Sequence, residues 1–221
     1  MPSTPLRSYR TVASAARAEL EVRRSRFVAD VARVGSEDEA RAVIETVRAG
    51  SRDAGHHCTA FVLGPEGGTR RSNDDGEPSG TAGAPMLDVL TGRGLGDVVA
   101  VVSRWFGGTL LGTGGLIRAY GDAVTAALEV AGAVRCEARV VWAVEVDHTD
   151  GPRVENALRE LSSATVTDTT WTGSGLRLEV AVAPSGVAGL TTLVAELTAG
   201  RAEPAEIGQT WVDVPVPTAR G

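Results

Sequence analysis

Residues 73–83 read NDDGEPSGTAG, and residues 104–120 read RWFGGTLLGTGGLIRAY. Glycine loses more backbone freedom on folding than any other residue, so two loops of this composition are costly to order. Close backbone packing, or a ligand that needs exposed N–H groups, has to offset that cost. These two stretches therefore carry most of the information about the fold and about any functional site.

The sequence between and around the two stretches has the periodicity of alternating strands and helices. Residues 97–103 contain the apolar run VVAVV, which is typical of a strand that is covered on both faces. Ser36 begins a capping box, and a helix with a buried stripe is predicted to follow it. The other elements predicted in this half are strands over 19–34, 57–63 and 69–72 and helices over 85–90 and 116–131.

A change of pattern near residue 136 indicates a second domain. From residue 139 the predicted order is strand, helix, strand, strand, helix, strand, which is the βαββαβ order of a ferredoxin-like split fold. The predicted elements are strands at 140–146, 165–171, 176–182 and 209–214, a helix capped by Thr149 or Asp150, and a helix over 184–199. We therefore predict an α+β protein with a loose lead-in over 1–18 and domains over 19–135 and 136–217.

Composition narrows the classes of function. The chain has 221 residues and a net charge of −6, which argues against a general nucleic-acid coat but leaves room for a local basic patch. All of its 22 basic side chains are arginine, which excludes lysine chemistry such as Schiff bases. Two cysteines form no disulfide framework, and no apolar run is long enough to span a bilayer, so we expect a cytoplasmic protein without membrane contact.

The second glycine-rich stretch is a candidate anion site. A glycine-rich lead into a helix presents unpaired N–H groups and the positive end of the helix dipole, and arginine adds bidentate contacts to phosphate. The residues of this hypothetical anion or RNA site are Arg104, Gly107, Gly108, Gly112, Gly114, Gly115 and Arg118. The alternative is a purely structural corner, with glycines for tight packing and Arg118 paired with Asp122. The stretch has neither Walker nor dinucleotide-binding spacing.

The first stretch contributes the acidic string Asp74, Asp75 and Glu77. Three close carboxylates are able to hold Mg²⁺ through water, but they have no ligand spacing. We favour the alternative that they accept hydrogen bonds from the arginine-containing stretch and brace the two loops together. Ser79 and Thr81 are candidates to cap the helix that follows. No metal site and no cofactor are predicted.

The tripeptide His56-His57-Cys58 raises the alternatives of a zinc site and a Cys–His nucleophile. On a strand, His56 and Cys58 point to one side and His57 to the other, which spoils a three-ligand cluster. No second ligand pair has zinc-like spacing, and no orienting third group is apparent. We therefore expect a half-buried strand edge with a hydrogen-bonded histidine, and no catalytic residue is predicted.

These motifs resemble those of the IMPACT family, specifically its two-domain bacterial branch. The match rests on Ser25-Arg26-Phe27, the segment 56–60, the acidic string through Gly83, and the second stretch through Tyr120. It covers residues 19–131 strongly, whereas the C-terminal half matches only in pattern and position. The chain departs from the family at Trp105, where tyrosine is usual, and at the pair His56-His57, where His-Asn is common. This second departure leaves a single-histidine role open between His56 and His57.

The resemblance implies a fold for each domain and a role in translation. The implied N-terminal domain has the left-handed βαβ fold of a small-subunit ribosomal protein and of the fourth domain of elongation factor G, and the second resembles the fifth domain of that factor. Eukaryotic relatives regulate translation by competing for an activator of a stress kinase, and they associate with ribosomes. The expected partners are thus the ribosome, structured RNA or a protein in translation control. Two alternatives stay open: an enzyme or binder acting on a small phosphorylated ligand, and a protein–protein adaptor without anion binding.

Overall fold

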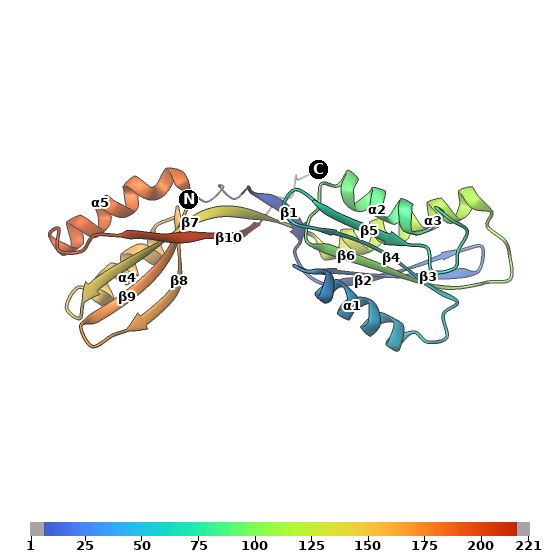
Figure 1. The fold of residues 1–221 in the computed structure, drawn as a ribbon, viewed down its shortest axis with the longest axis horizontal. Helices are drawn as coiled ribbons and strands as arrows, with labels where there is room; N and C mark the ends of the chain where they lie inside the picture. The colour runs from blue at the N-terminus through green and yellow to red at the C-terminus, as the bar shows by residue number, and fades with distance from the viewer. Residues whose placement is uncertain (1–6, 216–221) are drawn as a thin grey trace. The chain divides into compact units, whose positions relative to one another are not determined.

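A computed structural model describes residues 7–215 of the chain (Figure 1). They form a mixed α+β fold with five α-helices. Two compact units can be distinguished, one containing Tyr9–Cys136 and the other Glu137–Asp213, and each is described by itself. Within the described range, no helix has the length and apolar character needed to cross a membrane.

The first unit is built on a five-stranded antiparallel sheet. Its strand order is β2-β3-β6-β4-β5, so that β6 lies in the middle although it comes last in the sequence. The strands are β2 (Ala16–Val22), β3 (Ser25–Arg33), β4 (His56–Leu63), β5 (Thr69–Asn73) and β6 (Val98–Trp105).

Helices cover both faces of this sheet (Figure 1). Helices α2 (Gly83–Gly92) and α3 (Thr113–Ala131) pack on one face, and α1 (Glu37–Gly50) packs on the other. Successive residues of β6 point alternately into these two layers: Val98, Ala100 and Val102 join the core under α2 and α3, while Val99 and Val101 join the core under α1. A strand covered on both faces needs apolar residues at every position, which explains the run VVAVV.

The N-terminal segment is more ordered than its composition predicts. Residues 9–12 form strand β1 (Tyr9–Val12), which pairs with the beginning of β7 (Ala133–Asp147), and residues 16–18 already belong to β2. The expectation of a loose lead-in is therefore wrong for these residues, while residues 1–6 lie outside the described part. The physical reason is burial: Val12 is 1% exposed, and the Tyr9 hydroxyl donates a hydrogen bond to Asp97.

The second unit follows the order strand, helix, strand, strand, helix, strand, as the sequence pattern predicts. Strand β9 pairs antiparallel with both β7 and β8, and β10 pairs with β7. One apolar core lies between the sheet and both helices. After β7, the elements are α4 (Gly151–Glu160), β8 (Ala164–Trp171), β9 (Gly175–Val182), α5 (Val187–Thr198) and β10 (Ala205–Pro215).

Candidate functional site

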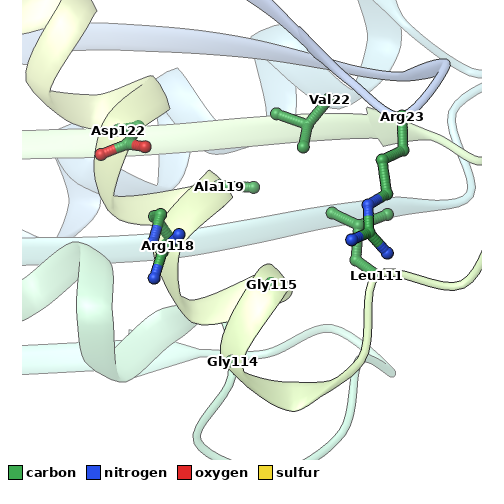
Figure 2. A pocket seen from close by; sticks show the side chains of 8 residues that line it. All are labelled: Val22, Arg23, Leu111, Gly114, Gly115, Arg118, Ala119 and Asp122. Atoms are coloured by element: carbon green, nitrogen blue, oxygen red, sulfur yellow. The ribbon is translucent and has the colours of Figure 1, made fainter.

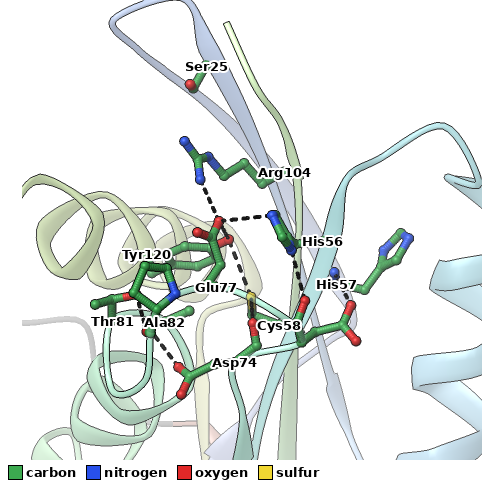
Figure 3. Close-up of polar contacts among 12 residues, drawn as sticks. Ser25, His56, His57, Cys58, Asp74, Glu77, Thr81, Ala82, Arg104 and Tyr120 are labelled. Carbon is green, nitrogen blue, oxygen red and sulfur yellow. Dashed lines mark hydrogen bonds and ion pairs between the residues drawn. The ribbon is translucent and has the colours of Figure 1, made fainter. Parts of the chain in front are cut away.

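A buried ion pair joins the two glycine-rich stretches in the first unit (Figure 3). Nη1 of Arg104, near the end of β6, donates to Oε1 of Glu77 at 2.6 Å, and the two residues are only 6% and 8% exposed. The hydroxyl of Tyr120 on α3 donates to the same oxygen at 2.8 Å. Two hydrogen bonds to one carboxylate oxygen help to offset the cost of removing both charges from water. The pair thus ties the acidic loop to β6 and α3.

His56 and Cys58 extend this network on the same side of β4. Nδ1 of His56 lies 2.8 Å from the carbonyl oxygen of Asp75, and since a carbonyl only accepts, Nδ1 carries the proton. Nε2 of the same ring lies 3.9 Å from Oε1 of Glu77. The Cys58 thiol donates to the Asp74 carbonyl oxygen at 3.0 Å. Burial raises the pKa of this thiol to about 12, which opposes a nucleophilic role because the reactive form is the thiolate.

His57 points to the other side of the strand, as the alternation of β4 predicts. Its ring Nδ1 lies 2.9 Å from the hydroxyl oxygen of Ser103, and its backbone N–H donates to Oδ2 of Asp75 at 2.7 Å. Burial lowers the pKa of this imidazole. Both histidines are therefore hydrogen-bonded, and residues 7–215 contain no group of three or more side chains placed to hold a metal ion.

Two of the three acidic side chains brace their own surroundings instead of the arginine-containing stretch. Asp74 accepts the backbone N–H groups of Gly80, Ala82 and Gly83 at 2.8–3.0 Å, and it thereby caps the N-terminus of α2. Partial burial on its own raises the pKa of Asp74, but these three hydrogen bonds outweigh it and the pKa is lowered. Asp75 accepts from Arg48 at 3.2 Å. Only Glu77 bonds to Arg104.

The predicted capping of α2 by Ser79 or Thr81 is wrong. The N-cap residue of α2 is Ala82, whose side chain makes no capping hydrogen bond. The hydroxyl of Thr81 donates to the carbonyl oxygen of Pro78 at 2.6 Å and not to the helix. The cap comes from Asp74, because the acidic loop folds back on the first turn of α2. A search limited to residues adjacent to the helix cannot find such a cap.

Several glycines of the second stretch have structural roles. A Cβ on Gly107 would lie 2.0 Å from the carbonyl carbon and oxygen of Arg24, so only glycine allows the loop to pack on the β2–β3 turn. The Gly107 N–H donates to Ser25 Oγ at 3.1 Å, which holds this contact. Gly108 and Gly112 have φ of 82° and 72°, in the left-handed region that favours glycine.

The structure separates the predicted anion-site residues into two pockets. The first, which we call the arginine pocket, has a volume of about 270 Å³ (Figure 2). The second, which we call the Glu77 pocket, has a volume of about 450 Å³. The arginine pocket is lined by three of the predicted residues, Arg118, Gly114 and Gly115, together with Val22, Arg23, Leu111, Ala119 and Asp122. The Glu77 pocket is lined by two of them, Arg104 and Gly112, together with His56, Glu77, Pro78, Phe106, Leu110, Leu111, Thr113 and Leu116. Gly107 and Gly108 line neither pocket.

The arginine pocket holds a residue that sequence reasoning missed. Arg23 lies in the two-residue turn between β2 and β3, and Figure 2 shows it and Arg118 on two sides of the first turn of α3. Neither arginine forms an ion pair with any described residue, so the alternative pairing of Arg118 with Asp122 is not formed. The signal in the sequence was the charged pair Arg23-Arg24 between two strands, far from the glycines.

The chain has relatives among known proteins. The Impact N-terminal domain profile matches residues 23–128. The IMPACT family member YvyE of Bacillus subtilis is 44% identical over 155 residues, which cover 70% of this chain and 71% of that protein. The chain belongs to the IMPACT family. All residues that line the two pockets, apart from Val22, fall within the IMPACT-matched region.

A second bacterial member of the IMPACT family and one solved structure are also similar to this chain. Escherichia coli YigZ is 49% identical over 110 residues, which cover 49% of this chain and 54% of that protein. The match thus spans about half the length of the E. coli relative. A crystal structure of a hypothetical protein is 33% identical with a TM-score of 0.63, and the alignment covers 91% of this chain and 98% of that one.

Proposed function

We propose that this IMPACT-family chain is a translation-associated binding protein of the cytoplasm, and that its arginine pocket contacts phosphates of the ribosome or of other structured RNA. One observation carries the proposal: two exposed arginines, Arg23 and Arg118, flank the start of α3 without a carboxylate partner among residues 7–215. A cation without an ion-pair partner keeps its full capacity to attract phosphate.

The start of α3 adds to this attraction. The first helical hydrogen bond runs from Leu116 N–H to the carbonyl oxygen of Gly112, and no side chain caps the helix. The N–H groups of the first turn therefore face outward at the positive end of the dipole. Asp122 lines the same pocket and weakens the field, but two guanidinium groups outnumber it.

The backbone of the β2–β3 turn favours a role for its arginine side chains. Arg23 and Arg24 have φ of 48° and 67°, values at which asparagine and glycine are the usual residues of a two-residue hairpin turn. Each arginine costs about 1 kcal/mol in such a conformation. Arg24 offsets part of this by donating to Thr109 Oγ1 at 3.0 Å, whereas Arg23 forms no hydrogen bond with a described residue.

The family resemblance supplies the remaining part of the proposal. It implies a role in translation, a protein partner in translation control, and domains related to a ribosomal protein and to the fourth and fifth domains of elongation factor G. Structured RNA is held mostly through phosphates and shape, which suits a chain with 4% aromatic residues.

The experiment is co-sedimentation of the full chain with ribosomes across a salt series. The test variant is Arg23→Gln/Arg118→Gln, and the matched control is Arg52→Gln/Arg71→Gln, which removes the same charge from exposed arginines outside both pockets. We expect the test variant to bind more weakly, with a salt slope lower by about 1 for each phosphate that an arginine no longer neutralises. Wild-type protein that fails to sediment even at low salt, or equal weakening in both variants, contradicts the proposal.

A further inference from the structure

We propose that the Glu77 pocket binds a carboxylate group attached to an apolar body, either a small organic acid or the C-terminus of a polypeptide with an apolar last residue. The pocket shares Leu111 and the start of α3 with the arginine pocket, but neither Arg23 nor Arg118 lines it, so its use does not depend on RNA binding. Its volume of about 450 Å³ lies within the range of ligand sites, which is roughly 300–1,000 Å³.

The walls of the pocket are apolar and exposed. Phe106 is 59% exposed and Leu110 is 82% exposed, although both belong to a short glycine-rich loop. Pro78, Leu111 and Leu116 complete the apolar lining. Large apolar side chains that gather at the rim of one pocket indicate a binding surface, whereas a single exposed leucine needs no explanation. The ligand therefore has an apolar body.

The floor of the pocket holds a guanidinium with unused donors. Arg104 is 6% exposed, and its only side-chain hydrogen bond to another residue in the range 7–215 runs from Nη1 to Glu77. Its Nε is buried and has no partner among the described residues. The guanidinium carbon lies 5.5 Å from the Phe27 ring centre and 5.7 Å from that of Phe106, so both rings can interact with the cation. A buried donor without a partner is costly, and Nη2, which donates to no described residue, is available to a ligand oxygen.

The charged groups at the floor of the pocket favour a ligand with a single negative charge. Glu77 and Arg104 neutralise one another, and the uncapped start of α3 at Gly112 and Thr113 adds about half a positive charge at the pocket. The His56 ring, whose Nε2 lies 3.9 Å from Oε1 of Glu77, adds no negative charge to the floor. The cost of removing an ion from water rises with the square of its charge, whereas its attraction to the positive floor only doubles, so a phosphate dianion is penalised more than a monoanion between these apolar walls. A carboxylate fits this balance better than a phosphate.

The test is a titration of the isotopically labelled full chain, followed by the backbone amide signals of Leu110 and Thr113, which line the Glu77 pocket and not the arginine pocket. The probes are 4-methylpentanoate, its amide, inorganic phosphate, and a peptide ending in Leu-Leu with either a free or an amidated C-terminus. We expect the acid or the free-ended peptide to shift these signals, and the matching amide to bind at least about tenfold more weakly. A free-ended peptide that binds more tightly than the small acid identifies a polypeptide terminus, and the reverse identifies a small acid.

Two variants separate the apolar wall from the rest of the surface. Leu110→Ser removes an exposed pocket residue, and Val130→Ser, on the 65% exposed Val130 outside the pocket, is its matched control. We expect Leu110→Ser to weaken carboxylate binding by about three- to tenfold and Val130→Ser to leave it unchanged. Equal binding of acid and amide, tighter binding of phosphate than of the acid, absence of binding at millimolar acid and peptide, or equal effects of the two variants each overturn the proposal.

Discussion

The Arg104 guanidinium donates to the Glu77 carboxylate at 2.6 Å, and the two side chains are only 7% and 3% exposed. The two residues come from different glycine-rich loops, so their pairing is the point at which the loops are held together. Loss of either partner leaves the other charge buried and unpaired.

Arg104→Ala and Glu77→Ala are each expected to lower the free energy of unfolding by about 3–5 kcal/mol, because removal of one partner of a buried pair leaves an uncompensated charge. The double variant Glu77→Ala/Arg104→Ala is expected to lose less free energy of unfolding than the sum of the two single losses, because it leaves neither charge unpaired. Urea unfolding of all four proteins measures this. Additive losses in the double-mutant cycle would show that the pair is not coupled.

Asp74→Ala is expected to destabilise the protein by about 1–3 kcal/mol, because three backbone N–H groups at the start of α2 lose their acceptor. The pKa of Asp74 is lower in the folded protein than its ordinary value of 3.8, so the stabilisation is fully present above pH 3.8 and is lost as the pH falls through the folded value. Asp74→Asn should therefore show a shallower loss of stability below about pH 4 than wild type. The measurement is the free energy of unfolding of both proteins as a function of pH. An identical loss of stability below about pH 4 in the two proteins would contradict this role.

The two cysteines are expected to resist a thiol-reactive reagent at pH 8 in the folded protein and to react fully in denaturant. Both side chains are 0% exposed, and burial raises the pKa of Cys58 to about 12, so the thiolate is scarce. A colorimetric thiol assay before and after unfolding counts the reactive groups. Rapid modification of Cys58 in the native state, located by mass spectrometry, is the result that opposes this expectation.

Gly107→Ala and Gly114→Ala form a matched pair of substitutions in the same stretch. At Gly107 the added methyl overlaps the Arg24 backbone, and we expect a loss of about 1–3 kcal/mol. At Gly114 nothing lies within 4 Å of the added methyl, and alanine in the helix is expected to gain up to about 0.5–1 kcal/mol. If the first turn of α3 approaches phosphate closely, Gly114→Ala should also weaken ribosome binding. Thermal unfolding and co-sedimentation measure the two effects separately.

Replacement of the β2–β3 turn by Arg23→Asn/Arg24→Gly is expected to stabilise the fold by up to about 1–2 kcal/mol, since these residues suit positive φ. The same double substitution should weaken ribosome binding, because it removes a cation from the arginine pocket. A variant that is both more stable and fully active in binding would show that the strained arginines serve no contact with RNA.

The elements with strong periodicity were predictable from the sequence, and the reason lies in local packing. The apolar run at 98–102 and the apolar stripe of α1 indicate directly which residues are buried. Similar patterns indicate the βαββαβ order of the second unit. Strand β1 was missed because Tyr9, Thr11 and Val12 are buried by residues far away in the chain, including Asp97. Periodicity within a four-residue strand is too short to be recognised.

The candidate site was predicted in its residue types but not in its grouping. The sequence placed Arg104 and Arg118 in one anion site, whereas Arg104 is buried against Glu77 and Arg118 faces a different pocket. The loop between Arg104 and α3 contains glycines with positive φ, which change the direction of the backbone. The spacing of residues along the sequence therefore does not show on which side of the start of α3 each arginine lies. Arg23 was missed because only the sheet brings the β2–β3 turn beside α3.

The central position of β6 has a consequence for how the first unit forms during synthesis. Hairpins β2–β3 and β4–β5 leave the ribosome first, yet they do not pair with one another, because β6 lies between β3 and β4. The nascent sheet therefore exposes two unpaired strand edges until the later segment arrives and inserts between them. Such edges are prone to aggregation, and contacts between distant segments form slowly. We expect the emerging chain to depend on shielding of these edges until β6 is complete.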